Sequence, residues 1–392
     1  MARPALVGGF GKMSSSVCLI NIYLTIPSRI MFLYNSLSLI SYSCLQCEEN
    51  KNNYLVRTSS GTCSSSPRTM ETNRLAPDSI STTLNKIKFG GYLAGLIEGD
   101  GTFAVHDKKS TAKKYRPMII IVFKNADLPL AEYLQKLTNC GVIQKKPNRG
   151  YVLWQISDIV GVYTIVKIIN GYMRTPKIEA LNRTIEWIND YIDNNKDSKL
   201  PSTKSILSNI NKIEKKSLDN SPIDSNPWLA GFTDSDGNFS INITKRSKQK
   251  LMRVQLFYRL EIRQTYHRLN NEEVSFFTIM SKIGTFLGSN VLSRSRIVGD
   301  KQYFSFIVTA TSKNSLEKTR YYFNKFPLLS SKYLDYLCWC KVIELQLANP
   351  ITTSYLDSAL QIRKDFNSTR TTYNWDHLKN SYLTHTINSC RG

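Results

Sequence analysis

Two stretches in the second half of the chain alternate between apolar and polar residues, which is the pattern of a half-buried β-strand. In residues 238–244 the apolar positions are Phe239, Ile241 and Ile243. In residues 253–263 the apolar positions are Val254, Leu256, Tyr258, Leu260 and Ile262. We predict two strands joined by a basic turn, with one apolar face buried and one polar face exposed.

The elements predicted around these strands occur twice. A glycine-rich acidic segment at residues 90–103 aligns without gaps, from Gly91 onward, with residues 227–239, so that Asp100 corresponds to Asp236 (236 − 100 = 136 positions later). Each segment is followed by a strand, a second strand, a helix, a hairpin and further helices. The predicted organisation is an extension (residues 1–85), a first repeat (86–193), a linker (194–226), a second repeat (227–370) and a C-terminal tail (371–392).

Small residues recur at every fourth position of the first segment, which places them on one face of a helix. They are Gly91, Gly95 and Gly99, and the second segment keeps Gly231 and Ser235 on the corresponding face. Glycine inside a helix costs about 1 kcal/mol, so its recurrence needs a structural reason. We predict that the two motif helices pack against each other through these faces, with Gly91 at the entrance of its helix.

Packing of this kind would bring Asp100 and Asp236 together at the C-terminal ends of the two helices. A carboxylate there faces the negative end of the helix dipole, and a second carboxylate nearby increases the repulsion. Divalent cations neutralise such a pair, and paired metal ions can stabilise both oxygens of phosphodiester hydrolysis. We therefore predict both residues as catalytic metal ligands for two or more Mg²⁺ ions. One Asp-Gly turn after a helix is commonplace, and only its repetition favours this function.

The charge of the chain indicates the partner of such a site. With 52 Lys and Arg against 30 Asp and Glu, the net charge is +22, which favours nucleic acid over an acidic membrane surface. Polar and basic side chains on the exposed sheet face can read base edges in the major groove, although an ordinary solvated face is the alternative. The predicted DNA-binding residues are Asn238, Ser240, Asn242, Arg253, Gln255, Arg259 and Arg263, with Lys245, Arg246 and Lys248 in the turn.

Eight cysteines are too few for a disulfide scaffold. The two close pairs, Cys44/Cys47 and Cys338/Cys340, lie far from the four histidines, so free thiols are favoured over a structural zinc site.

The extension differs in composition from the rest of the chain. It is rich in serine and has no acidic residue before Glu48, which is typical of an organelle transit peptide. An upstream segment without a fold of its own has the same composition, so both interpretations remain. Pro27 and Arg29 divide its apolar stretch into runs too short to span a bilayer, and we expect no stable membrane insertion.

Residues 93–101 (LAGLIEGDG) and 229–237 (LAGFTDSDG) resemble the nine-residue motif of the LAGLIDADG homing endonucleases. The resemblance covers about residues 86–370 and is to the single-chain, double-motif branch encoded in mitochondrial introns. It implies an α+β fold of two pseudo-symmetric αββαββα repeats, whose antiparallel sheets form a DNA-binding saddle. It also implies a monomer that acts as a pseudo-dimer and cleaves both strands of double-stranded DNA with Mg²⁺.

The resemblance implies further site residues. The eighth position of each motif, Asp100 and Asp236, is the metal-binding acid, whereas Glu98 and Asp234 belong to the helices. Lys177 and Lys332 match the family's lysine before the late helix of each repeat. Gln264 matches a polar catalytic position at the end of the second strand, with Asn125 or Lys124 as its counterpart in repeat one. A phosphate clamp or plain surface charge is the alternative role of each lysine.

Two functions fit these features. The first is a site-specific mitochondrial DNA endonuclease that promotes intron mobility, and the second is a maturase that binds its host intron RNA and assists splicing. Both motif acids are intact, which favours the nuclease. A transcription regulator would need an added helix-turn-helix module, and an intein would need a terminal nucleophile and a His-Asn pair. The sequence has neither feature.

Overall fold

The computed structural model of the protein describes residues 41–42, 77–105, 116–146, 148–245, 252–267, 273–348, 353–364, 366–368 and 370–383. Most of the predicted extension, the pair Cys44/Cys47, and the turn residues Arg246 and Lys248 lie outside these ranges.

Repeat one has the predicted order of elements and a four-stranded antiparallel sheet with the strand order β2-β3-β5-β4. Its elements are α1 (Pro77–Asp100), β2 (Gly101–Ala104), β3 (Met118–Lys124), α2 (Leu128–Thr138), β4 (Val142–Lys145), β5 (Tyr151–Ile156), α3 (Ile159–Ile169) and α4 (Ile178–Asn195).

Repeat two has the same topology, with the sheet order β10-β11-β7-β6. Its elements are α6 (Trp228–Asp236), β6 (Gly237–Lys245), β7 (Met252–Arg263), α7 (Phe277–Leu287), β10 (Val291–Val298), β11 (Lys301–Ala310), α8 (Lys313–Lys325), α9 (Lys332–Ala348) and α10 (Thr353–Lys364). A short hairpin of β8 (Thr265–His267) and β9 (Glu273–Ser275) follows β7. The predicted fold of two αββαββα repeats is confirmed.

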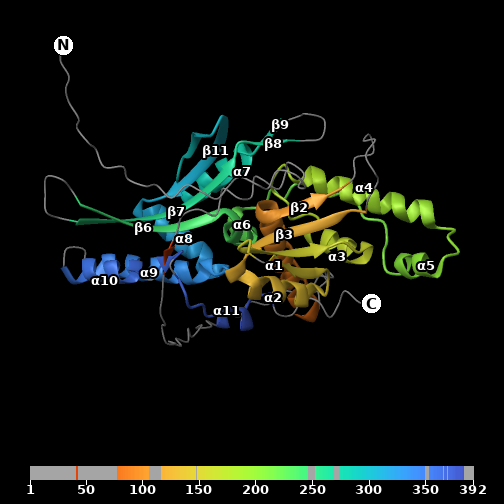
Figure 1. Cartoon of the computed structure of the whole chain (residues 1–392), viewed down its shortest axis with the longest axis horizontal. Coiled ribbons are helices and arrows are strands. Elements are labelled where there is room, and N and C mark those ends of the chain that lie inside the picture. The colour runs from red at the N-terminus through yellow and green to blue at the C-terminus, as the bar shows by residue number, and fades with distance from the viewer. Residues whose placement is uncertain are drawn as a thin grey trace, which may run out of the picture. The chain divides into compact units, whose positions relative to one another are not determined.

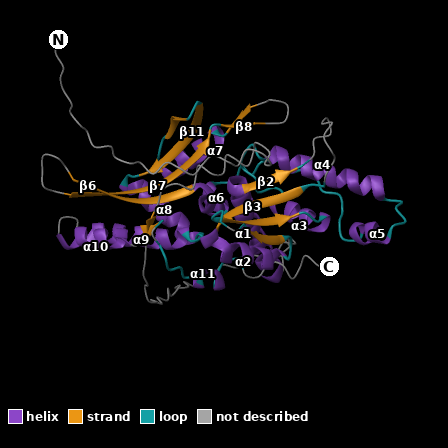
Figure 2. Cartoon of the chain, viewed as in Figure 1, coloured by secondary structure: helices purple, strands orange, loops and turns teal. Residues whose placement is uncertain are grey.

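The alternation along β6 and β7 is that of a half-buried sheet, as predicted. Phe239 and Ile241 of β6 and Leu256 and Tyr258 of β7 are buried. Figure 2 shows β6 and β7 above helices α9 and α10, and β2 and β3 above α2 and α3, so that helices cover one face of each sheet. The opposite face of each sheet points away from the apolar core.

Three segments depart from the predicted boundaries. Helix α1 begins at Pro77, ahead of residue 86, and proline suits a first helical position because its missing N–H would have no partner there. The linker contains α5 (Pro201–Leu207) and the short helix η3 (Ile223–Ser225), and buries Ile213. Asn189 of α4 donates to the Ile213 carbonyl oxygen (2.9 Å), and η3 packs against α6 and α7 of repeat two, so the linker contacts both repeats.

The C-terminal segment also packs against the core. It contains α11 (Asp376–Lys379), buries Leu383, and contacts both repeats through Tyr133 Oη to Ser381 Oγ (2.7 Å) and His377 Nε2 to the Leu329 carbonyl (3.0 Å). The two-residue strands β1 (Ser41–Tyr42) and β12 (Phe366–Asn367) pair antiparallel. No helix in the described ranges is long and apolar enough to cross a bilayer.

Candidate active site

Helices α1 and α6 lie side by side at the centre of the two repeats, and their backbones are in contact (Figure 1). A Cβ at Gly95 would lie 2.0 Å from the Trp228 carbonyl oxygen, and a Cβ at Gly231 would lie 2.0 Å from that of Tyr92. Neither position can hold a larger residue unless the helices separate. These two glycines therefore have the packing role that their spacing predicts.

Gly91 has a different environment from the one expected. Because α1 begins at Pro77, Gly91 lies inside the helix rather than at its entrance. A Cβ there would meet the side chain of Asn226, with its Oδ1 at 2.9 Å, and not the backbone of α6. A side chain moves more easily than a helix backbone, so Gly91 still tolerates substitution better than Gly95.

Asp100 and Asp236 are the last residues of α1 and α6, and both are half-buried. The two helix ends are close enough that Asp236 Oδ2 lies 3.2 Å from the position of a Cβ on Gly99. The next residue in each repeat begins the first strand of its sheet. The structure therefore places one carboxyl group from each repeat at the junction of the two sheets.

The electrostatics of this pair are unfavourable in the absence of a cation. Burial and the charge of Asp236 raise the pKa of Asp100 to about 7. Burial also raises the pKa of Asp236, against the opposing effect of Lys332, Lys177 and Arg263. At neutral pH the pair retains part of a proton, which a divalent cation would displace.

Lys177 and Lys332 occupy equivalent places, each beside the C-terminal end of the motif helix of its own repeat. Each ammonium group donates to backbone carbonyl oxygens at or just after the last turn of the helix, and its charge lies at the negative end of the helix dipole. The acceptors are the carbonyl oxygens of Ile97 (3.1 Å), Gly99 (3.3 Å) and Gly101 (2.9 Å) for Lys177, and of Thr233 (3.0 Å) and Ser235 (2.7 Å) for Lys332.

The two lysines are also electrostatically coupled to the acids. Burial lowers the pKa of Lys177 to about 8, with Arg263 acting in the same direction and Asp236 against it. Burial lowers the pKa of Lys332 as well, and the charge of Asp100 opposes this shift. The structure thus brings four of the five predicted catalytic residues into one cluster.

The fifth, Gln264, lies at the end of β7, where its amide donates to Ser293 Oγ and to the Ser305 carbonyl oxygen (3.3 Å). These bonds direct the amide toward β10 and β11. The strand registers pair Gly101 with Ile121 and Gly237 with Leu260, which makes Asn125 the counterpart of Gln264 and Lys124 the counterpart of Arg263.

The acids two positions earlier in each motif, Glu98 and Asp234, are buried and hold the loop before the late helix. Glu98 accepts from the Thr175 amide (2.6 Å) and hydroxyl (2.6 Å). Asp234 accepts from the Leu329 amide (2.8 Å) and the Ser330 hydroxyl (2.5 Å). Each loop leads directly to the lysine of its repeat, so these two acids position Lys177 and Lys332.

The same two acids also join the repeats. Trp228 of α6 donates its indole N–H to Glu98, and Tyr92 of α1 donates its hydroxyl to Asp234 (2.8 Å). Tyr92 and Trp228 occupy equivalent positions, since 228 − 92 = 136, the spacing of the motifs. Each half of the helix pair thus supplies an aromatic donor to the acid of the other half.

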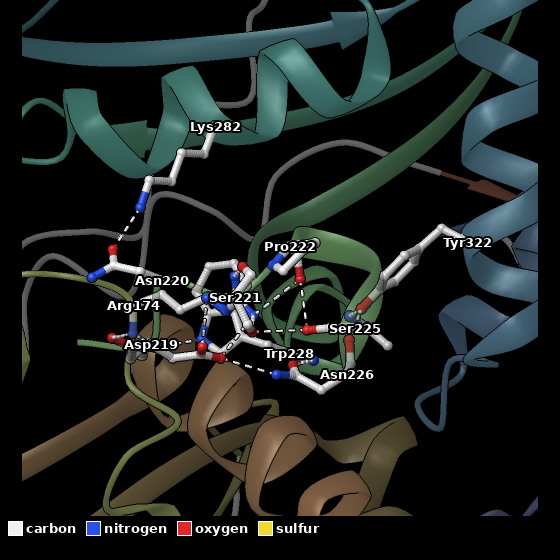
Figure 3. Close-up of polar contacts among 12 residues, drawn as sticks. Arg174, Asp219, Asn220, Ser221, Pro222, Ser225, Asn226, Trp228, Lys282 and Tyr322 are labelled. Carbon is white, nitrogen blue, oxygen red and sulfur yellow. Dashed lines mark hydrogen bonds and ion pairs between the residues drawn. The ribbon is translucent and has the colours of Figure 1, made fainter. Parts of the chain in front are cut away.

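The end of the linker is anchored beside this helix pair (Figure 3). The buried guanidinium of Arg174 pairs with Asp219 (2.7 Å) and donates to the Ser221 carbonyl oxygen (2.7 Å). Asn226 donates to Asp219 (2.9 Å), and its carbonyl oxygen accepts from Tyr322 Oη of repeat two (2.9 Å). Arg174 and Tyr322 therefore fix the start of α6 from opposite sides.

The predicted DNA-binding residues of repeat two share one face of its sheet. The β6–β7 register pairs Asn238 with Arg259 and Asn242 with Gln255. Every described residue of the predicted set is half-buried or exposed, on the side away from the core. This group is Asn238, Ser240, Asn242, Arg253, Gln255, Arg259 and Arg263; of Lys245, the last residue of β6, only the backbone is described.

The sequence analysis missed two arginines on the same face. Arg294 and Arg296 of the edge strand β10 both pair with Glu261 of β7, the former at 3.4 Å. Ser305 also donates to Glu261 (2.8 Å). The alternation of arginine with serine over residues 293–296 is the signal that could have identified this strand face.

The donor set at the helix ends fits a hard cation whose remaining ligands come from water and substrate phosphate. Mg²⁺ typically binds one or two carboxylates in this way. Within the described ranges, no group of three or more His, Cys, Asp or Glu residues could form a closed metal site. Cys338 and Cys340 are buried in α9.

Comparisons with known proteins agree with this architecture. The LAGLIDADG endonuclease family profile matches residues 93–188 and 229–343. The chain is 47% identical over 315 residues to the intron-encoded DNA endonuclease aI3 of Saccharomyces cerevisiae, covering 76% of this chain and 74% of that protein. It is 30% identical over 258 residues to an uncharacterized cox1 intron-2 protein of Schizosaccharomyces pombe, covering 66% of each. The fold is similar to that of the LAGLIDADG homing endonuclease I-GzeII in complex with DNA target (TM-score 0.51, 18% identity, 72% of this chain and 99% of that chain).

Proposed function

The chain belongs to the LAGLIDADG endonuclease family, and we propose that it is a site-specific endonuclease that hydrolyses both strands of its DNA target and thereby promotes intron mobility. One observation carries this proposal: the paired helices bring Asp100 and Asp236 together at the junction of two sheets, one of which exposes a basic polar face. The names of both relatives refer to introns, and one refers to a DNA endonuclease.

Asp100 and Asp236 would hold the metal ions, which we propose to be two or more Mg²⁺. When bound, such ions activate a water molecule and stabilise the developing charge on the phosphate oxygens. The proton that the acid pair retains at neutral pH must leave before metal binds, so ligation should strengthen as pH rises through about 7. The touching helices fix the distance between the two acids and thus between the two scissile phosphates.

Lys177 and Lys332 would supply positive charge beside the reacting phosphates. Their bonds to the helix carbonyl oxygens hold each ammonium group in one position, and preorganised charge of this kind stabilises a transition state without further rearrangement. Gln264 bonds to the β10–β11 hairpin, so it would act on substrate only after exchanging those bonds. A positioning role for Gln264 is the simpler assignment.

Binding would place the outer sheet faces in the major groove. Guanidinium groups such as those of Arg253, Arg259 and Arg263 can contact guanine in a bidentate manner, and the β6–β7 turn can contact phosphate. A single chain carries both halves of the interface, so one monomer covers one complete site. The cox1 intron in one relative's name supports a mitochondrial location.

The test is cleavage of a randomised duplex library by the full chain with Mg²⁺, followed by sequencing of the cut ends. Asp100→Asn and Asp236→Asn should each abolish double-strand cleavage and leave affinity for the selected site equal or higher, because a neutral amide no longer repels phosphate. Asp300→Asn, at an exposed turn, is the matched control and should cut like the parent. Full cleavage by either motif variant would refute the two-acid site.

The alternative function, assistance in splicing of the host intron RNA, needs no metal-dependent cleavage. It predicts binding of intron RNA and splicing activity that survive Asp100→Asn. The intact acid pair favours the nuclease, and no separate feature of the described residues favours the maturase.

A further inference from the structure

We propose that repeat one reads its half of the DNA site through the 5-methyl groups of thymine, whereas repeat two reads polar base edges. This inference rests on the proposed DNA-binding function and adds the chemical class of the bases that each half prefers. It is carried by the side chains on the outer face of the sheet of repeat one.

Branched aliphatic residues occupy the middle of that outer face. Ile120 and Val122 of β3 alternate with the buried Ile119, Ile121 and Phe123. The neighbouring strand adds an aliphatic residue directly opposite, because the β3–β5 register pairs Val122 with Leu153. The side chains of Ile120, Val122 and Leu153 are half-buried, point away from the core, and form one apolar surface.

Two of the three equivalent positions in repeat two are charged, and the third is Ile307, which pairs with Glu261 as Leu153 pairs with Val122. Since the registers equate Ile121 with Leu260, Ile120 occupies the position of Arg259, and Val122 occupies that of Glu261. The two sheets therefore present different chemistry from the same backbone positions. A surface that binds only phosphate would not need an aliphatic centre.

Polar side chains border this apolar surface, since the registers place Thr102 and Gln155 on either side of Ile120. Gln144 of the edge strand accepts from Lys146 (2.9 Å) and donates to Gln155 (3.0 Å), so these side chains form a chain of hydrogen bonds. At the other margin, Lys124 lies 3.8 Å from the carboxylate of Asp127. Lys124 and Lys146 thus place positive charge at the margins, where a duplex presents its phosphates.

A DNA duplex is the occupant that fits an aliphatic centre with basic margins. In the major groove, the 5-methyl group of thymine is the apolar element of the base edges, and aliphatic side chains contact it directly. β2 begins immediately after Asp100, so the surface is continuous with the candidate active site. A duplex engaged by the two acids therefore lies along this sheet.

The experiment replaces thymine with deoxyuridine in the selected target, one half-site at a time. Deoxyuridine keeps every hydrogen-bonding group and removes only the methyl group. Each contacted methyl group should contribute about fourfold in affinity, from the burial of one methyl-sized apolar group. We expect cumulative losses of this size in the half-site bound by repeat one. The mean loss per thymine should be smaller in the other half, where Phe257, Leu292 and Ile307 are the apolar exceptions on the outer face.

Protein variants assign the half-sites and test the contact directly. Val122→Thr preserves side-chain shape and weakens the apolar contact, so the deoxyuridine penalty at its base pair should shrink toward onefold. Leu200→Thr, an aliphatic-to-threonine change at an exposed position of the linker, is the control and should keep the full penalty. Ile120→Arg should shift preference at one position of that half-site from thymine to guanine.

The outcomes separate the inference from the proposed function. If the chain neither binds nor cuts DNA, the proposed function fails, and this inference fails with it. If it cuts its target but deoxyuridine has no effect in either half, only the thymine assignment is overturned. Stable dimers with no deoxyuridine effect would show that a second copy, rather than DNA, covers this face.

Discussion

The two repeats share the geometry of the candidate active site and differ in their outer sheet faces. At the helix ends, each repeat contributes one acid, one lysine bound to backbone carbonyl oxygens, and one buried acid that holds the loop before the lysine. On the sheets, Ile120 and Val122 stand where Arg259 and Glu261 stand in the other repeat. Cleavage of a DNA strand requires the same chemistry from both halves. An asymmetric target, by contrast, presents different bases to the two sheets.

The geometry that the two repeats share at the helix ends should be most sensitive to substitutions at the contact between α1 and α6. Gly95→Leu and Gly231→Leu must push α1 and α6 apart, because each Cβ would meet a backbone carbonyl oxygen at 2.0 Å. Overpacking costs about 1–3 kcal/mol, and a displacement near 1 Å can reduce rate on the order of a hundredfold. We expect cleavage to fall by roughly that factor and melting temperature to fall with it.

Gly91→Leu is the control for this effect, since a larger residue there meets the Asn226 side chain. Its loss of cleavage should be smaller than that of either interface variant. If Gly95→Leu melts and cuts like the parent, the helix pair does not set the geometry of the acids.

Arg259→Ala tests the difference between the outer sheet faces of the two repeats. Loss of one bidentate guanine contact costs about 1–3 kcal/mol of discrimination, so base preference should relax at one position of the half-site bound by repeat two. Preference in the other half-site should be unchanged, which a binding-site profile measures at every position. Relaxation spread evenly over both halves would show that Arg259 contacts phosphate instead.

A smaller effect distinguishes the two acids. The folded pKa of Asp100, about 7, lies above the ~3.9 of an unfolded carboxyl group, so the folded state binds this proton more tightly. Without metal, stability should therefore fall as pH rises from about 4 to 7, and Mg²⁺ should restore it most at the upper end of this range. Melting temperatures in chelator and in Mg²⁺ across that window measure the effect.

Asp100→Asn should flatten this pH dependence more than Asp236→Asn. Arg263 faces Asp236 and favours its charged form, whereas its counterpart in repeat one, Lys124, is paired with Asp127. A parent protein whose melting temperature is constant from pH 4 to 7 in chelator would contradict the raised pKa of Asp100.

The structural features that follow from local periodicity could be predicted from the sequence. The alternation at residues 238–244 and 253–263 identified β6 and β7, and the four-residue spacing of glycines identified the helix contact. The motif acids could be located because both repeats carry them. These features depend on neighbours in the chain or on comparison of its halves, whereas the two lysines were assigned by resemblance to the family.

Long-range contacts could not be predicted in this way. The bonds from Arg174 to the linker join segments about 45 residues apart, and the C-terminal segment reaches Tyr133 from a separation of 248 residues. The pairing of Arg294 and Arg296 of β10 with Glu261 of β7 could not be predicted, because a salt bridge across three strands requires the register of the sheet. Gln264 was placed in the catalytic set by resemblance, and its observed bonds depend on the hairpin beside it.

The reciprocal bonds from Trp228 to Glu98 and from Tyr92 to Asp234 bear on how such proteins can be recombined. A half taken alone would lose the aromatic donor to its carboxylate, and the loss of one partner of a buried polar group costs about 1–3 kcal/mol. A chimaera that joins this first repeat to a foreign second repeat must therefore import an aromatic donor for Glu98 and an acid for Tyr92 together. Exchange of whole halves is then restricted to partners that carry the same reciprocal pair, whatever DNA sequences their sheets prefer.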